Sequence, residues 1–221
     1  MDLKERVISS LKKHDVGDEF SYIRSLSKAS VLIPIFVSER ELHVLLTVRS
    51  TELKHNAGEV CFPGGKADPQ DRDEIETALR EAQEEIGLPP DGVEVVCKLW
   101  PVLNLRGLLV TPVVGFISES FRACPNPAEV SEVFCVPLEF FLKDDNHSSY
   151  PVPSIGSFTH SFIFTDPITG KVNQIWGLTA FLLIILAMLS LGKEPEFRMG
   201  FDMDKPAACL RRFLEQRLSK L

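Results

Sequence analysis

The stretch GEVCFPGGKADPQDRDEIETALREAQEEIGL, residues 58–88, is the part of the chain around which the rest is organised. Its pattern predicts a short strand over 59–62, a Pro-Gly-Gly turn over 63–65, a polar loop, and an amphipathic helix over 73–86. Three glutamates lie in the second half of that helix. The turn therefore delivers the chain to a helix whose negative charge is concentrated near its end.

Local signals predict the ends and the buried face of this helix. Asp71 and Asp73 are candidate N-caps, and Gly87 is expected to end the helix in the left-handed conformation. Successive residues turn by about 100°, so five apolar side chains share one arc and predict the buried face: Ile75, Ala78, Leu79, Ala82 and Ile86. Glu81 and Glu85 share a second arc at the edge of that face.

Glu84 lies one step further round the helix than Glu81 and Glu85. Like charges at this spacing weaken a helix, so a neutralising partner is expected. A hard divalent cation fits, because Mg²⁺ is usually held by a few carboxylates together with substrate phosphates. The alternative is that these glutamates form the solvated face of a surface helix, which is a common pattern.

Residues 80–88, REAQEEIGL, resemble the second half of the signature of the Nudix hydrolase family, R-E-apolar-x-E-E-x-G-apolar. Gly65 resembles its opening glycine, although fifteen steps separate residue 65 from residue 80 and the family usually has fourteen. Asp71 is the acid nearest to the signature's first glutamate, which is mainly structural in the family. The resemblance implies an α/β fold of the Nudix type, an α/β/α sandwich with a mixed β-sheet, and hydrolysis of a diphosphate with Mg²⁺ or Mn²⁺ as cofactor.

The same resemblance implies roles for individual residues. Glu81 and Glu85 are expected to be the firmest metal ligands, with Glu84 as a third ligand that also serves catalysis. The backbone at Gly65 is expected to assist in holding the metal. Arg80 is expected to act in catalysis by orienting a carboxylate rather than by touching substrate.

A further catalytic acid, acting as base or extra ligand, often comes from a distant loop in this family. Glu129 and Glu132 are the candidates, in the segment NPAEVSEVFCVPL over 126–138. The Asn-Pro pair that opens this segment indicates a turn, which suits a site loop. The alternative is that one of the two is a surface charge at the start of a strand.

The segment LLTVRSTELKHNAGEVCFPGG, residues 45–65, resembles the extra motif of the coenzyme A diphosphatase branch of the Nudix family. The resemblance implies that Arg49, Ser50 and Lys54 bind substrate. Lys54 stands where an arginine is more usual, which keeps the charge but loses the bidentate fork. On physical grounds alone, pairing of Arg49 with a surface acid is an equal alternative.

Together the two resemblances imply a metal-dependent enzyme that cleaves coenzyme A and its thioesters into 3′-phosphoadenosine 5′-phosphate and 4′-phosphopantetheine or its acyl form. One alternative is a Nudix hydrolase of NADH or ADP-ribose. Another is a Nudix-like binding domain without catalysis. It is less well supported, because such domains usually lack a signature glutamate and this sequence has all three.

Composition limits the class of protein. The 221 residues and the 44% hydrophobic fraction suit one globular domain with a full core. A net charge of −7 argues against a nucleic-acid surface, which needs clustered Lys and Arg. Five scattered cysteines without a C-x-x-C pair favour reduced thiols of an intracellular protein over disulfides or a zinc site.

The end of the sequence, Ser219, Lys220 and Leu221, matches the peroxisomal import address. It predicts a peroxisomal protein that binds the import receptor, and the alternative is a frayed helix end. The chain is therefore divided into a helix and lead-in over 1–25, the Nudix hydrolase domain over 26–195, and a C-terminal segment over 196–221 that ends in the signal.

Apolar patterning predicts the remaining elements. The expected strands are 30–37 and 41–48 as a hairpin, 93–99, 108–116, 132–136, and a second hairpin of 158–165 with 171–176. Residues 176–191 form the most hydrophobic run, and its sixteen residues fall short of the about 20 that span a membrane. This run predicts a helix buried against the sheet and ended by Gly192, and membrane insertion is the lesser alternative.

Overall fold

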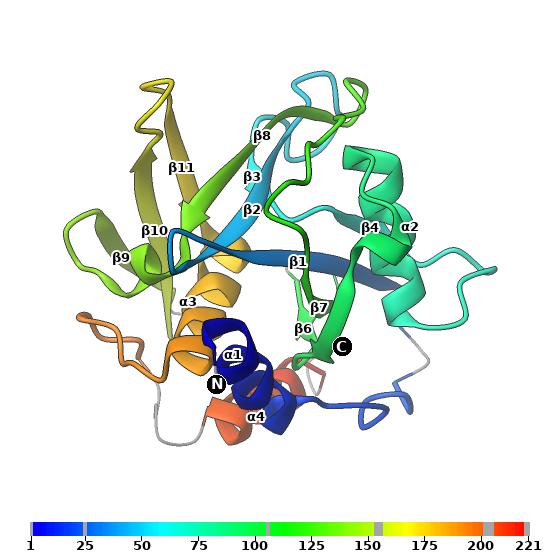
Figure 1. Ribbon diagram of the computed structural model, residues 1–221. Coiled ribbons are helices and arrows are strands. Elements are labelled where there is room, and N and C mark those ends of the chain that lie inside the picture. The colour runs from blue at the N-terminus through cyan, green and yellow to red at the C-terminus, as the bar shows by residue number, and fades with distance from the viewer. Residues whose placement is uncertain (1, 24–25, 105–106, 153–156, 201–205, 219–221) are drawn as a thin grey trace.

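The computed structural model describes residues 2–23, 26–104, 107–152, 157–200 and 206–218. Over these residues a mixed sheet is packed between helices on both faces, as the α/β/α prediction requires (Figure 1). The helices are α1 (Leu3–Leu11), α2 (Glu74–Ile86), α3 (Gly177–Leu191) and α4 (Pro206–Leu218), with 3₁₀ turns η1 (Lys12–His14), η2 (Pro90–Gly92) and η3 (Leu138–Leu142). The strands are β1 (Lys28–Ser38), β2 (Glu41–Arg49), β3 (Val60–Cys61), β4 (Gly64–Lys66), β5 (Glu94–Lys98), β6 (Val102–Leu103), β7 (Leu109–Phe116), β8 (Val130–Pro137), β9 (His147–Val152), β10 (Ser157–Thr165) and β11 (Val172–Trp176).

The central sheet forks between β1 and β2, and this fork positions the site. The two strands pair antiparallel beside their hairpin, over 35–38 and 41–44. Further on, β3 pairs with β2 and β4 pairs with β1, so residues 60–66 fill the wedge between them. The Leu32 N–H donates to the Pro63 carbonyl at 2.9 Å and holds the two arms of the fork together. Because β1 also pairs with β7 in parallel, the sheet is mixed.

The predicted turn over 63–65 is wrong in part, because Gly64 and Gly65 begin strand β4. A Cβ on Gly64 would lie 2.4 Å from the carbonyl oxygen of Ser30 on β1. A side chain at that position would therefore force the paired strands apart. The glycine pair marks a close approach of two backbones rather than a turn alone.

Helix α2 begins and ends as its local signals predict. The Asp73 side chain accepts a hydrogen bond from the Glu76 N–H at 2.8 Å, and Gly87 adopts φ 69° at the C-cap. Of the two candidate N-caps, Asp73 takes the role, while Asp71 turns toward Arg80. The negative N-cap and the left-handed glycine thus fix the length of the helix that carries the site.

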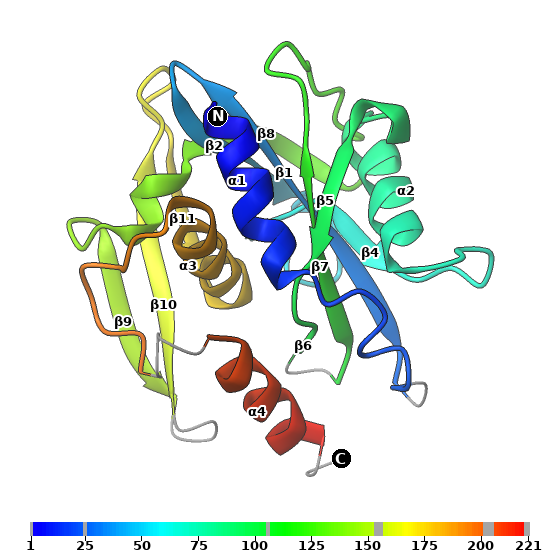
Figure 2. The same ribbon diagram turned by 60° about the horizontal axis from the view of Figure 1, so that its bottom comes forward.

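The two faces of the sheet are covered by different helices (Figure 2). On one face, Ala78, Ala82 and Ile86 of α2 are fully buried in a core shared with β1, β2 and β7. On the other face, Val7 and Leu11 of α1 share a larger core with α3. The burial of the apolar stripe of α2 therefore places the adjoining edge of the helix, which carries Glu81 and Glu85, at the fork of the sheet.

A second, antiparallel sheet of β9, β10 and β11 lies beside α3. The predicted hairpin of 158–165 with 171–176 is confirmed by the pairing of β10 with β11. The predicted buried helix over 176–191 is confirmed as α3, which ends at Gly192 with φ 64°. In the part of the chain that the structure describes, no helix has the length and apolarity to cross a membrane.

Candidate metal centre

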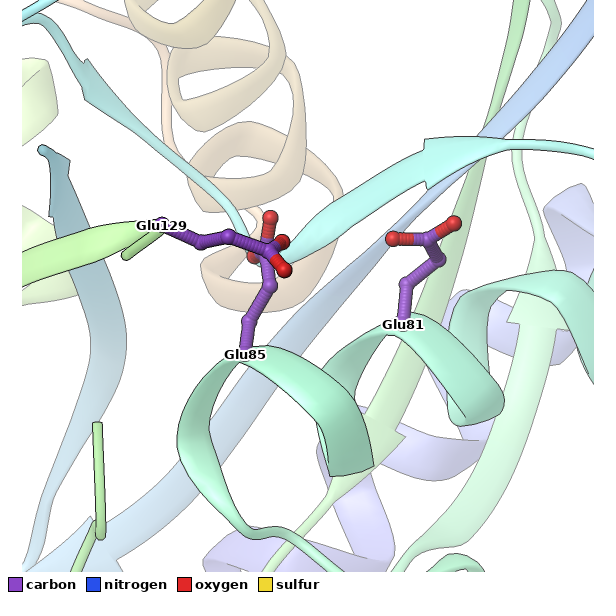
Figure 3. Close-up of side chains that lie close together, drawn as sticks. All are labelled: Glu81, Glu85 and Glu129. Carbon is purple, nitrogen blue, oxygen red and sulfur yellow. The ribbon is translucent and has the colours of Figure 1, made fainter. Parts of the chain in front are cut away.

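Three carboxylates from two parts of the chain converge at the fork of the sheet. Glu81 and Glu85 project from α2, and Glu129 reaches toward them from the loop before β8 (Figure 3). One carboxylate oxygen of each residue lies within 4.8 Å of those of the other two. The structure thus brings the two firmest predicted ligands together with one of the two acids expected from a distant loop.

The glycine pair of β4 lies against two of these carboxylates. The Gly64 N–H donates to Oε2 of Glu85 at 3.1 Å. A Cβ on Gly65 would lie 2.4 Å from Oε2 of Glu81, so a side chain there would displace this carboxylate. Gly65 therefore acts in the site through the space that it leaves for Glu81.

The electrostatics of the cluster suit a cation. Burial raises the pKa of Glu85, which is 3% exposed, to about 8. The Gly64 N–H and the Arg49 charge oppose this rise, whereas the charges of Glu81 and Glu129 add to it. Burial also raises the pKa of Glu81. Crowded carboxylates of this kind fit a hard divalent cation, which takes oxygen ligands and offsets their repulsion.

Arg80 binds the polar loop before α2 and also holds the cluster. Its Nε and Nη2 atoms donate to the two carboxylate oxygens of Asp71 at 2.9 and 3.0 Å, and Nη2 also donates to the Lys66 carbonyl at 3.0 Å. Its Nη1 atom donates to Glu81 at 2.9 Å and to Glu84 at 3.3 Å. Asp71 thereby anchors the guanidinium that holds Glu81 in place.

Two predicted acids lie away from the three-carboxylate cluster. The side chain of Glu84 is 52% exposed and pairs with Arg80, because it projects further round the helix than Glu85. Glu132 on β8 forms an ion pair with Lys171. The predicted roles of Glu84 as ligand and catalytic residue stay predictions, and the convergence favours Glu129 over Glu132.

Of the three predicted substrate-binding residues, Arg49 and Ser50 border the carboxylate cluster, and Lys54 makes no contact within the described part of the chain that shapes it. Arg49 lies at the irregular end of β2, and its buried Nε has no hydrogen-bond partner among the described residues. Ser50 is buried, and its N–H donates to the Glu129 carbonyl at 2.8 Å. Lys54 is exposed in the loop between β2 and β3.

Two contacts of the site were not predicted from the sequence. Gly64 supplies the N–H that Glu85 accepts, and the Asn126 side chain donates to Glu129 at 3.3 Å. The Phe-Pro-Gly-Gly run and the Asn-Pro pair were their signals in the sequence. Each signal indicated a turn, but neither indicated its contact: Glu85 is 21 residues after Gly64, and Glu129 is three residues after Asn126.

Replacing Gly65 with alanine is expected to lower kcat/KM for the expected diphosphate hydrolysis by about 10²-fold. The added Cβ displaces the Glu81 carboxylate, and a misplacement of about 1 Å at an active site can lower the rate by this factor. The clash involves the far end of a side chain that can move, so the melting temperature should change little. Kinetics and thermal melting of the purified variant measure both effects. A folded variant with full activity would contradict the role given to this glycine.

The forked sheet and its acidic helix define a recognised class of protein. The NUDIX domain model matches residues 26–153, and the chain belongs to the Nudix family, whose hydrolases typically use divalent metal ions. It is 46% identical to the mouse peroxisomal coenzyme A diphosphatase NUDT7 over 215 residues, which cover 96% of this chain and 91% of the mouse protein.

Other relatives extend across kingdoms. The Arabidopsis thaliana protein Nudix hydrolase 15, mitochondrial, is 44% identical over 174 residues, which cover 77% of this chain and 61% of that protein. Among solved structures, a MutT/nudix family protein from Enterococcus faecalis aligns with a TM-score of 0.50 at 15% identity, covering 96% of this chain and 92% of that one. This last likeness bears on the fold alone.

Proposed function

We propose that this protein hydrolyses the diphosphate bond of coenzyme A and its thioesters, giving 3′-phosphoadenosine 5′-phosphate and 4′-phosphopantetheine or its acyl form. The observation that carries the proposal is the convergence of the Glu81, Glu85 and Glu129 carboxylates, one oxygen of each lying within 4.8 Å of the others. The Ser50 N–H donates to the Glu129 carbonyl at 2.8 Å, so the segment 45–65 that resembles the coenzyme A diphosphatase motif adjoins this cluster. The 46% identity to the mouse coenzyme A diphosphatase supports the same substrate.

The proposed cofactor is Mg²⁺ or Mn²⁺, held by Glu81, Glu85 and Glu129 with help from the backbone at Gly65. Such a cation supplies positive charge to phosphate oxygens and lowers the pKa of bound water. Arg80 keeps the Glu81 carboxylate aimed at the cluster through its hydrogen bond of 2.9 Å.

Arg49 supplies fixed positive charge on the substrate side of the proposed site. Its guanidinium acts on the Glu85 carboxylate, whose pKa it lowers against the effect of burial. The Nε–H is buried and has no partner in the described residues, so a phosphate oxygen would satisfy it and gain a charge-assisted hydrogen bond. Ser50 fixes the Glu129 backbone, and Lys54 is proposed to reach the substrate from its exposed loop.

A substrate panel tests this function. Coenzyme A, acetyl-coenzyme A, a long-chain acyl-coenzyme A, NADH and ADP-ribose are each assayed with Mg²⁺ and with Mn²⁺, in ¹⁸O-labelled water with mass spectrometry of products. We expect kcat/KM for coenzyme A to exceed that for NADH and ADP-ribose by about tenfold or more, and chelation by EDTA to abolish turnover. A preference for NADH or ADP-ribose would replace the proposed substrate, and no turnover of any of them would favour a binding domain.

We also propose peroxisomal localisation and binding to the import receptor, supported by the name of the mouse relative. The predicted signal, Ser219 to Leu221, lies outside the described residues. The full sequence with a fluorescent protein fused before residue 1 should be found in peroxisomes. The same fusion without the last three residues should be found in the cytosol. Unchanged localisation after the deletion would show that this tripeptide is not the address.

A further inference from the structure

The loop that carries Glu129 is fastened to the end of α2 by backbone hydrogen bonds. The last carbonyls of a helix lack partners within it and need donors from elsewhere. Here the Cys124 N–H donates to the Ile86 carbonyl at 2.9 Å, and the Asn126 N–H donates to the Glu85 carbonyl at 2.8 Å. Asn126 is therefore attached directly to the residue that carries the most buried carboxylate of the cluster.

The same asparagine also sets the backbone of Glu129. Its carbonyl accepts the Glu129 N–H at 2.9 Å and the Val130 N–H at 2.8 Å, so it determines where β8 begins. From the other side, the Ser50 N–H donates to the Glu129 carbonyl at 2.8 Å. The backbone of Glu129 is thus held between α2 and the end of β2.

The side chain of Asn126 completes the arrangement. Its Oδ1 accepts the Ala128 N–H at 3.2 Å, which identifies the oxygen of the amide and leaves the nitrogen to face Glu129. That nitrogen, Nδ2, donates to Oε1 of Glu129 at 3.3 Å. An ionised carboxylate has acceptor sites for this donor and for a cation together.

From these contacts we propose that Asn126 is a positioning residue that aims the Glu129 carboxylate at Glu81 and Glu85 for binding of a divalent cation. The proposal rests on the proposed function, because it assumes the cation site. Asn126 is placed to act through Glu129, and hydrogen-bond partners of metal ligands commonly set affinity in this way.

The test measures Mn²⁺ binding to the full-length protein by isothermal titration calorimetry, with kcat for coenzyme A as a second readout. We expect Asn126→Ala to weaken Mn²⁺ binding by about tenfold. Asn126→Ser keeps an oxygen that can accept the Ala128 N–H but lacks the donor that reaches Glu129. It should recover melting temperature relative to Asn126→Ala and still bind Mn²⁺ about tenfold more weakly than the wild type.

A double-mutant cycle separates this role from a structural one. In the Glu129→Ala background, Asn126→Ala should change Mn²⁺ affinity by less than about twofold, because its effect passes through the missing carboxylate. The matched control is Asp166→Ala, since Asp166 accepts the N–H groups of Ile168 and Thr169 in the β10–β11 hairpin. It should lower the melting temperature and leave Mn²⁺ affinity unchanged.

Each other outcome overturns the inference. Wild-type affinity in Asn126→Ser, or an equal loss from Asn126→Ala with and without Glu129, would show that Asn126 does not position the carboxylate, and the proposed function would stand if coenzyme A is still hydrolysed. Failure of the wild type to bind Mn²⁺ would overturn the cation site and this inference together.

Discussion

Replacing Glu85 with glutamine is expected to lower kcat/KM for coenzyme A by about 10³-fold or more. The change replaces one carboxylate of the three-carboxylate cluster by an amide, which cannot carry a negative charge, while keeping the size of the side chain. A bound metal ion supplies several kcal/mol of charge stabilisation, and each 1.36 kcal/mol is a tenfold change in rate. The loss should appear in kcat, and Mn²⁺ binding should weaken in parallel.

The same substitution should preserve the fold. Burial raises the pKa of Glu85 to about 8 in the metal-free protein, above the ordinary value of 4.5. A group with a raised pKa favours folding at pH below its ordinary value, and this contribution is lost as pH rises toward the folded pKa. In EDTA at pH 8, Glu85→Gln should therefore be at least as stable as the wild type in urea unfolding.

A control on the same helix shows that loss of negative charge alone does not cause the effect. Glu76 is four residues after Arg72, pairs with it at 3.1 Å on the surface, and lies in the first turn of α2. Glu76→Gln should keep wild-type kcat and Mn²⁺ affinity. Activity that survives in Glu85→Gln would remove Glu85 from the metal centre and favour the solvated-face interpretation of the helix.

The helix could be predicted because its determinants are local. Asp73, Gly87 and the apolar spacing lie within the segment itself, and these signals agree with the observed boundaries. The pairing of Gly64 and Gly65 with β1 could not be predicted in the same way, since their partners are Val31 and Ser30, far away in sequence. Two adjacent glycines fit a turn and a close strand contact equally well.

The site shows the same division between local and long-range information. Helical geometry alone places Glu81 and Glu85 on one arc, and the structure brings their carboxylates together. The approach of Glu129 depends on the docking of its loop onto the end of α2 through Cys124 and Asn126. The sequence shows both acids in the segment 126–138, but the hydrogen bonds that dock the loop of Glu129 onto α2 form only in the fold.

Replacing Asp71 with asparagine is expected to lower the free energy of unfolding by about 2 kcal/mol at neutral pH, because a charge-assisted pair with Arg80 is lost. The Asp71 side chain is 6% exposed, and it also accepts from the Thr77 hydroxyl at 2.8 Å and the Asp68 N–H at 2.9 Å. The Arg80 guanidinium holds the pKa of Asp71 well below its ordinary value of 3.8.

The pH dependence identifies the charge as the cause. A depressed folded pKa contributes stability that is complete above the ordinary value and is lost as pH falls below it. The difference between the wild type and Asp71→Asn should therefore be constant from about pH 5 to 8 and shrink below about pH 4. Urea unfolding across this range measures it, and a difference independent of pH would point to packing instead.

Activity should fall with stability, because Arg80 also holds the cluster. Without the Asp71 charge, the Arg80 guanidinium loses its anchor, so it should no longer hold the Glu81 carboxylate, to which it donates at 2.9 Å, toward the cluster. We expect about tenfold weaker Mn²⁺ binding, as is typical when a partner of a metal ligand is removed. Asp71→Glu tests the one-residue difference in the signature loop. If this variant keeps the stability and the Mn²⁺ binding of the wild type, the site requires the pairing with Arg80 and not the loop length.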